Sequence, residues 1–264
     1  MIQIVVLASG SSGNAIYLES RGDALLIDAG ISRLQIERRI SDVGGSMENV
    51  RALLVSHEHS DHIKGMSVLM KRHPFPAYMT EGTLRALSRQ PGDWTPDSRV
   101  ETFQVLRPFR VGAWAVRAFP TPHDAEEPVG FILEAGGIRV GIATDMGEIR
   151  QEVVSELSGV HGLVLEFNHD PAMLASGPYP PFLKARIAGP GGHLSNEEAG
   201  GLLESVAHRG LGAVILAHLS ETNNHPELVR RTAAQHLNGY ATKFEVASRD
   251  APKVLRLRMR SLAV

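Results

Sequence analysis

The sequence contains no cysteine in its 264 residues. This absence excludes disulfide bonds, thiolate metal sites and a cysteine nucleophile. It also fits a reducing compartment. A metal site in this chain would therefore have to be built from imidazole nitrogens and carboxylate oxygens.

An excess of charge of one sign and long apolar runs are also lacking. The formal net charge is only −2, so affinity for nucleic acid would have to come from local patches or bound metal. No apolar run approaches the roughly 20 residues that a membrane helix needs. Residues 1–7 lack a basic segment and are too short for the apolar part of a signal peptide. We therefore expect a soluble, cytoplasmic protein without membrane attachment.

The apolar residues gather in short runs that predict many strands. The predicted strands cover residues 2–7, 15–18, 24–27, 51–56, 76–79, 100–106, 113–119, 129–133, 138–143, 162–166, 211–217, 244–246 and 254–259. Predicted helices cover 33–42, the segment around 63–70, 83–88, 149–157, 195–208 and 226–237, with loops at 90–98 and 176–192. Strands followed by strand–helix alternation in each half predict an αββα four-layer sandwich of two mixed β-sheets flanked by helices. Because no domain boundary is visible, we expect a single domain, residues 1–264.

One segment, His57-Glu58-His59-Ser60-Asp61-His62, is unusually rich in metal-ligand side chains. At the end of a strand, His57 and His59 point to the same side, and Asp61 and His62 follow at the turn into a helix. Three imidazoles and a carboxylate at this spacing can serve two neighbouring ions of zinc, manganese or iron(II). The alternative is a solvated, histidine-rich loop.

Further polar residues follow other predicted strands. His123, Asp145 and His218 all lie at strand ends, where loops commonly present functional groups. With the 57–62 segment they make five histidines and two aspartates, enough for two metal ions. Asp28, at another strand end, is either a turn residue or a buried carboxylate that orients the metal loop.

This constellation resembles the metallo-β-lactamase fold superfamily. Within it, the WalJ (YycJ) type of bacterial metallohydrolase is similar along nearly the whole chain, through residues 7–14, 56–65, 143–145, 168–170, 177–180, 192–197 and 217–224. The resemblance implies two divalent ions, zinc or manganese, with iron also compatible. One ion would be held by His57, His59 and His123, the second by Asp61, His62 and His218, with Asp145 bridging the pair. It also implies metal-dependent 5′→3′ DNA exonuclease activity and a link to cell-wall two-component regulation.

A second resemblance concerns Glu166 and His193, which match a dyad of the tRNA 3′-end processing nucleases of the superfamily. There the histidine protonates the leaving oxygen, so Asp61, Glu166 and His193 are the expected catalytic residues, with Asp61 orienting the attacking hydroxide. His193 could otherwise be an ordinary residue at a helix start. The short segment between His123 and Asp145 leaves no room for the long tRNA-gripping arm of those enzymes. Residues 146–217 are likewise too few for the inserted cap domain of the mRNA-processing nucleases.

Substrate contacts are expected near the loop 176–192, whose aromatic and basic side chains could stack bases and neutralise phosphates. Alternatively, this loop packs on the body of the protein. The candidate substrate-binding residues are His169, Tyr179, Lys184, Arg186 and Asn223. For His169, a hydrogen-bonding role behind the site is an equal alternative. The last strand carries a stripe that is either a phosphate track or a solvated face, formed by Arg256, Arg258 and Arg260.

The sequence thus predicts a metal-dependent phosphodiesterase acting on nucleic acid, with DNA favoured. Alternatives on the same scaffold are a hydrolase of small esters, thioesters or lactams, and an RNA-directed nuclease. A non-catalytic binding module is a third class. The dyad of Glu166 and His193 favours phosphodiesters, because acyl transfer has less need of it.

Overall fold

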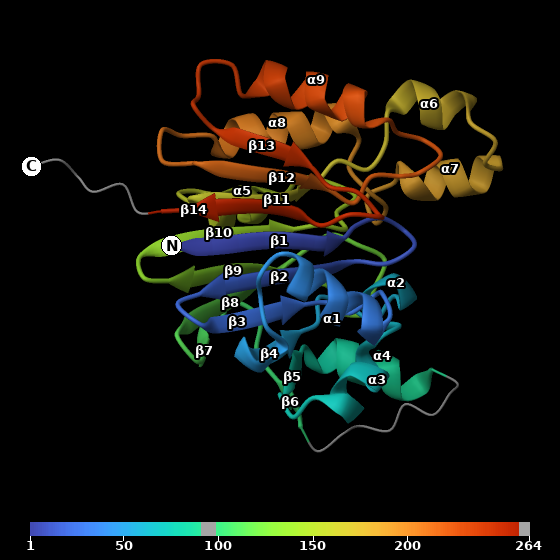
Figure 1. Cartoon of the computed structure of the whole chain (residues 1–264). Helices are drawn as coiled ribbons and strands as arrows, with labels where there is room; N and C mark the ends of the chain where they lie inside the picture. Colours follow the sequence, from blue (N-terminus) through green and yellow to red (C-terminus); the bar gives the residue numbers. More distant parts are fainter. Residues whose placement is uncertain (91–98, 259–264) are drawn as a thin grey trace, which may run out of the picture.

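The computed structural model describes residues 1–90 and 99–258, in which two seven-stranded β-sheets pack face to face (Figure 1). The first sheet has the order β14 (Lys253–Leu257), β1 (Ile2–Ala8), β2 (Ala15–Ser20), β3 (Asp23–Ile27), β4 (Val50–Leu54), β5 (Ala77–Met79), β6 (Val100–Thr102). The second has the order β13 (Lys243–Val246), β12 (Ala213–Ala217), β11 (Gly162–Glu166), β10 (Ile138–Ala143), β9 (Val129–Ala135), β8 (Trp114–Pro120), β7 (Phe109–Val111).

Strand β1 shows why the sheets read as apolar runs rather than as alternating patterns. Ile2, Ile4 and Val6 face the core between the two sheets, and Val5 and Leu7 face the helices outside. Because both faces of the sheet are covered, both sets of alternating side chains are buried. Trp114 and Phe131 are among the large side chains that fill the space between the sheets.

Helices cover the outer face of each sheet (Figure 1). The outer face of the first sheet packs against α1 (Arg33–Asp42), α3 (Met66–Arg72) and α4 (Glu81–Arg89). The outer face of the second packs against α5 (Gln151–Leu157), α8 (Asn196–Val206) and α9 (Pro226–His236). These layers confirm the predicted αββα sandwich. Within the described ranges, every helix is too short or too polar to span a lipid bilayer.

Several predicted element boundaries were wrong. The loop predicted at 176–192 contains α7 (Pro181–Ile187), and α6 (Pro171–Ser176) precedes it. Pro171 and Pro181 occupy the first turns of these helices, where a missing N–H costs nothing, so the proline content of this segment did not exclude a helix. The helix expected after the 57–62 segment is split into α2 (Ser60–Ile63) and α3, and the strand expected over 100–106 is only β6. Residues 91–98 of the predicted surface loop, and Met259 and Arg260 of the last strand and its stripe, lie outside the described residues.

Strand directions bring the loops after different strands to one end of the sandwich. In the first sheet, β3 and β4 are parallel. In the second sheet, β10, β11 and β12 are parallel, and β8 shares their direction because β9 is antiparallel to both β8 and β10. Residues that follow these strands therefore converge from distant parts of the chain.

Candidate metal centre

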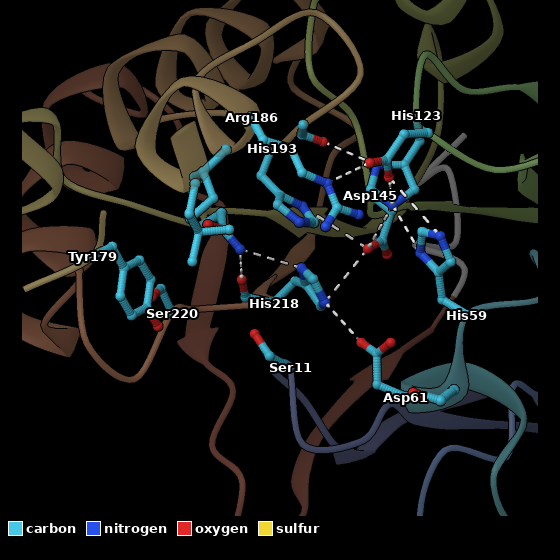
Figure 2. Close-up of a pocket in the computed structure, with 16 residues that line it drawn as sticks. Ser11, His59, Asp61, His123, Asp145, Tyr179, Arg186, His193, His218 and Ser220 are labelled. Atoms are coloured by element: carbon cyan, nitrogen blue, oxygen red, sulfur yellow. Dashed lines mark hydrogen bonds and ion pairs between the residues drawn. The ribbon is translucent and has the colours of Figure 1, made fainter. Parts of the chain in front are cut away.

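All seven residues predicted as metal ligands lie together where the two sheets meet at this end. Figure 2 labels those that line the cavity, which are His59, Asp61, His123, Asp145 and His218. The 57–62 segment follows β4, and His123, Asp145 and His218 follow β8, β10 and β12. Ligand-type atoms of His57, His59 and His123 lie within 4.8 Å of one another, as do those of Asp61, His62 and His218. Asp145 lies between these groups, with its carboxylate oxygens 3.8 Å from His123 Nε2 of the first group and 3.5 and 3.4 Å from His62 Nε2 and His218 Nε2 of the second.

The backbone at these strand ends is unusual. Asp28, Asp145 and His218 are three of the five non-glycine residues with positive φ in the described chain, at 59°, 61° and 57°. Such left-handed conformations cost about 1 kcal/mol or more each and persist only where the surroundings enforce them. Because three of them lie at this site, the surrounding structure must stabilise an unfavourable backbone conformation that positions two carboxylates and one imidazole.

The 57–62 segment is fixed by close backbone contacts with the loop between β1 and β2 and with the loop after β3. Asn14 N–H donates to the carbonyl of Asp61, and Ala29 N–H donates to the carbonyl of His62. Gly30 leaves the room for this approach, since a Cβ on it would lie 1.6 Å from the Asp61 carbonyl oxygen. A glycine is therefore required at this position by packing against the metal loop.

Four of the five histidines are held by a hydrogen bond from Nδ1 to a group outside the ligand set, and Nδ1 of the fifth, His59, lies 3.3 Å from His123 Nε2. His62 donates to Asp28 over 2.8 Å, and His57 to the hydroxyl of Ser56 over 3.0 Å. The remaining two are His123, which donates to the Gly192 carbonyl over 3.0 Å, and His218, which donates to Glu166 over 2.9 Å. In the neutral form of these rings the proton lies at Nδ1 and each Nε2 presents a lone pair to the site, the arrangement typical of metal-binding histidines.

Two further observations show that these donor atoms suit divalent metal ions. His57 Nε2, His218 Nε2 and Asp145 Oδ2 are buried and lack a hydrogen-bond partner in the described chain. Unpaired buried polar atoms are costly, and a metal ion is the partner that would satisfy all three. The set contains only nitrogen and oxygen, which suits zinc, manganese or iron(II).

The electrostatics of the site favour a cation. Burial would lower the pKa of His218, but the carboxylates of Asp145, Asp61 and Glu166 outweigh burial and raise that pKa to about 10. Burial would likewise raise the pKa of Asp145, yet His218 and His62 hold it well below the usual range. The buried carboxylates thus stay ionised and stabilise positive charge between them, which divalent ions supply.

Glu166 connects the metal site to His193. Its Oε1 accepts hydrogen bonds from His193 Nδ1 over 2.8 Å and from His218 Nδ1 over 2.9 Å. Its Oε2 accepts the backbone N–H groups of Met146 and Leu194. Burial would raise the pKa of Glu166, but the two neighbouring imidazoles lower it to about 2. An ionised Glu166 therefore fixes both rings, as predicted for His193 and in addition for His218.

A cavity of about 370 Å³ opens onto the cluster of candidate metal ligands (Figure 2). Among the predicted substrate-binding residues, Tyr179 and Arg186 line it, and Arg186 pairs with Asp124 over 2.7 Å. Lys184 does not line it and instead donates to the Ala175 carbonyl, which ties α7 to α6.

The other two predicted substrate contacts, His169 and Asn223, are buried at 3% and 0% exposure. Neither lines the cavity. Because both side chains are buried, these positions do not support direct contact with substrate. The sequence suggested contact because a motif at a strand end does not reveal which of its side chains turn inward. For His169 the geometry favours the alternative role behind the site.

Sequence reasoning assigned no role to three residues that contact the ligands. Asn14 Nδ2 lies 3.1 Å from both Asp61 Oδ2 and His62 Nε2. Ser56 bridges Asp28 to His57, and Asp124 lies 3.5 Å from His123 Nε2. Ser56 and Asp124 could have been found from the sequence, because each directly adjoins a predicted ligand, His57 or His123. Asn14 reaches the site only through the pairing of β1 with β2, whose connecting loop contains it.

Comparisons with known proteins agree with the geometry. The β-lactamase superfamily domain matches residues 24–219. The chain is 35% identical over 253 residues to the exodeoxyribonuclease YycJ of Bacillus anthracis, covering 94% of this chain and 95% of the relative. It is 33% identical over 234 residues to the exodeoxyribonuclease WalJ of Streptococcus pneumoniae (serotype 2, strain D39), covering 88% and 87%.

The fold also matches solved structures. The crystal structure of the metallo-β-lactamase fold protein YhfI from Bacillus subtilis superposes with a TM-score of 0.73 at 18% identity, covering 97% of this chain and 100% of that one. This fold implies divalent metal ions, in keeping with the clusters of histidine and aspartate. The predicted resemblance and enzyme class are confirmed. The chain belongs to the metallo-β-lactamase fold members of the β-lactamase superfamily, in the family of the YycJ and WalJ proteins, and is a metallohydrolase.

Proposed function

We propose that this protein is a DNA exonuclease that hydrolyses phosphodiester bonds in the 5′→3′ direction, with two divalent ions held within a single domain. The observation that carries the proposal is the Glu166–His193 pair beside the complete ligand set. The names of the YycJ and WalJ relatives support DNA as the substrate. The polarity comes from the family resemblance.

The proposed ligands are those that the family resemblance implies. His57, His59 and His123 would hold one ion, Asp61, His62 and His218 would hold the other, and Asp145 would contribute its carboxylate to both. Zinc or manganese, and also iron(II), suits these donors. When bound, two such ions activate water and stabilise the negative charge that develops at a phosphodiester.

The chain's own residues then supply orientation and a proton. Asp61, at the edge of the cavity with its carboxylate about one-fifth exposed, accepts a hydrogen bond from the attacking water. His193 lines the same cavity, and its Nδ1 is bound to Glu166, so Nε2 is left to donate a proton to the leaving oxygen. The ionised Glu166 stabilises the charged imidazolium that this donation requires. Arg186 faces the cavity and offers a guanidinium to a phosphate.

The test is cleavage of end-labelled DNA by protein loaded with zinc or manganese. We expect successive release of nucleotides from the 5′ end, complete loss with EDTA, and loss in Asp61→Ala. Matched RNA, and a panel of small esters, thioesters and lactams, should be poor substrates. Absence of DNA cleavage, or equal cleavage by Asp61→Ala, would refute the proposal, and preferential hydrolysis of the small substrates would assign the site to the alternative class.

Asp28→Asn should weaken metal binding roughly 10- to 100-fold, the usual effect of removing a carboxylate that orients a ligand. The Asp28 carboxylate accepts hydrogen bonds from His62 Nδ1 and from the backbone and hydroxyl of Ser56, and an amide cannot accept all three with the same charge. Competition with a chromogenic chelator measures the affinity. Asp42→Asn, an exposed carboxylate on α1, is the control. Equal affinity in the two variants would mean that Asp28 is only a turn residue.

A further inference from the structure

A second hollow, of about 520 Å³, lies next to the metal-site cavity on the side of the first sheet. The loop after β3, the start of α1 and the start of α3 form its walls, with Arg249 on its rim. The proposed reaction uses none of its residues. Its lining combines exposed aliphatic side chains with cations, which is the chemistry of a nucleotide site.

The apolar part is formed mainly by Leu34 and Val68. These side chains are 65% and 55% exposed, among the most exposed large apolar residues of the described chain. Ile31 lies in the same lining. Exposed aliphatic groups that share one hollow indicate a surface for a flat apolar partner, and every nucleobase has such a face.

The cationic part is formed mainly by Lys64 and Arg39. Lys64 is exposed and has no ion-pair partner in residues 1–90 or 99–258. Arg39 binds the carbonyl oxygens of Leu7 and Arg249 rather than a carboxylate. Two further cations of the lining, Arg33 and Arg249, are paired with Glu37 and Glu221, and Asp250 is the acidic residue of the lining. Asp250 acts electrostatically on Arg39, so the unbalanced positive charge of the hollow is carried by Lys64.

Residues that are neighbours in the sequence line the hollow and the metal-site cavity. Ser11 lines the metal-site cavity and Ser12 lines the hollow. Asp61 and Lys64 stand three residues apart on α2 and its carboxyl cap, a rise of about 5 Å along a helix axis. A strand whose scissile phosphate lies at Asp61 can therefore present its next phosphate to Lys64.

We propose that this hollow binds the nucleotide next to the scissile phosphodiester in single-stranded DNA, with Lys64 and Arg39 contacting its phosphate and Leu34 and Val68 contacting its base. The inference rests on the proposed nuclease function and adds where the substrate strand continues. An acidic peptide is the rival occupant, but it would leave the aliphatic surface without a flat partner.

The test measures binding separately from cleavage, by fluorescence anisotropy of a labelled single-stranded oligonucleotide with the metal-loaded protein in a His193→Ala background. Lys64→Ala should weaken binding about three- to tenfold and reduce the slope of log affinity against log salt by about 0.7, as expected for one lost phosphate contact. Leu34→Asp should weaken binding at least as much, because it places a carboxylate where the base and phosphate lie. The matched controls are Lys71→Ala, an exposed lysine farther along α3, and Leu106→Asp, an exposed leucine outside the hollow.

The outcomes separate the two claims. If Lys64→Ala and Leu34→Asp bind DNA as the controls do while wild-type protein cleaves it, the subsite is wrong and the nuclease function stands. If binding depends on Lys64 but wild-type protein cleaves no DNA, the proposed function fails instead. Binding of a polyglutamate peptide that depends on Lys64, without such dependence for DNA, would overturn the assignment to nucleic acid. Circular dichroism and thermal melting check that these surface variants are folded.

Discussion

Asp145→Asn is expected to release most of the bound metal and to reduce DNA cleavage by at least about 10³-fold. The Asp145 carboxylate is 3% exposed and lies 3.4 to 3.8 Å from the Nε2 atoms of His218, His62 and His123, which belong to both proposed ligand groups. An amide loses the negative charge and can present N–H donors toward ions. Loss of metal-derived stabilisation worth several kcal/mol corresponds to a rate loss of this size.

The substitution is chosen so that the fold is retained. Asp145 has φ 61°, and asparagine adopts this left-handed conformation about as readily as aspartate, whereas alanine does not. Metal content by plasma mass spectrometry, read beside thermal melting and exonuclease rate, is the measurement. Glu134→Gln, an exposed carboxylate on β9 in the same sheet, should keep full metal and activity. Wild-type metal content in Asp145→Asn would show that this carboxylate is not a ligand.

Local spacing explains why the 57–62 segment was the most predictable part of the site. His57 and His59 share a side because of extended backbone, and Asp61 and His62 follow as the chain turns into α2. These relations depend only on neighbouring residues. The chemistry of metal ligands then makes the segment recognisable without knowledge of the fold.

The remaining ligands depended on tertiary structure. Sequence placed His123, Asp145 and His218 at strand ends, but their meeting follows from the shared direction of β8, β10 and β12, which hydrogen bonding between distant strands decides. Residue pattern does not contain that information, and the family resemblance supplied it. Asn14 was missed because its contact with the ligands also depends on how distant segments of the chain pair.

Burial limited the predictions of substrate contacts. His169 and Asn223 lie in polar loop segments that read as accessible, yet they are buried against the loops following β11 and β12. Asp170 N–H donates to the Asn223 carbonyl, so the two loops hold each other in place. Arg186 lies on α7 and Tyr179 lies just before it. The proline in the first turn of α7 led to the prediction of a loop, but the aromatic and basic composition of the segment still indicated side chains that line the cavity.

His193→Ala is expected to lower kcat on DNA by roughly 10²- to 10⁴-fold while leaving the metal content unchanged. His193 lines the cavity and is 2.8 Å from Glu166, but its ring is not among the seven proposed ligands. The effect should depend on the leaving group. A nucleotide alkoxide needs a proton as it departs, whereas a nitrophenolate does not, so His193→Ala should be impaired far less on a bis-nitrophenyl phosphodiester.

The comparison between the two substrates separates proton donation from positioning. A variant that had disturbed the metal centre through Glu166 and His218 would lose both activities equally, together with metal. His236→Ala, a histidine on α9 that pairs with Glu204 away from the cavity, should leave both rates unchanged. Equal losses on DNA and on the nitrophenyl diester, with metal retained, would assign His193 to substrate binding, because only a proton donor should distinguish poor leaving groups from good ones.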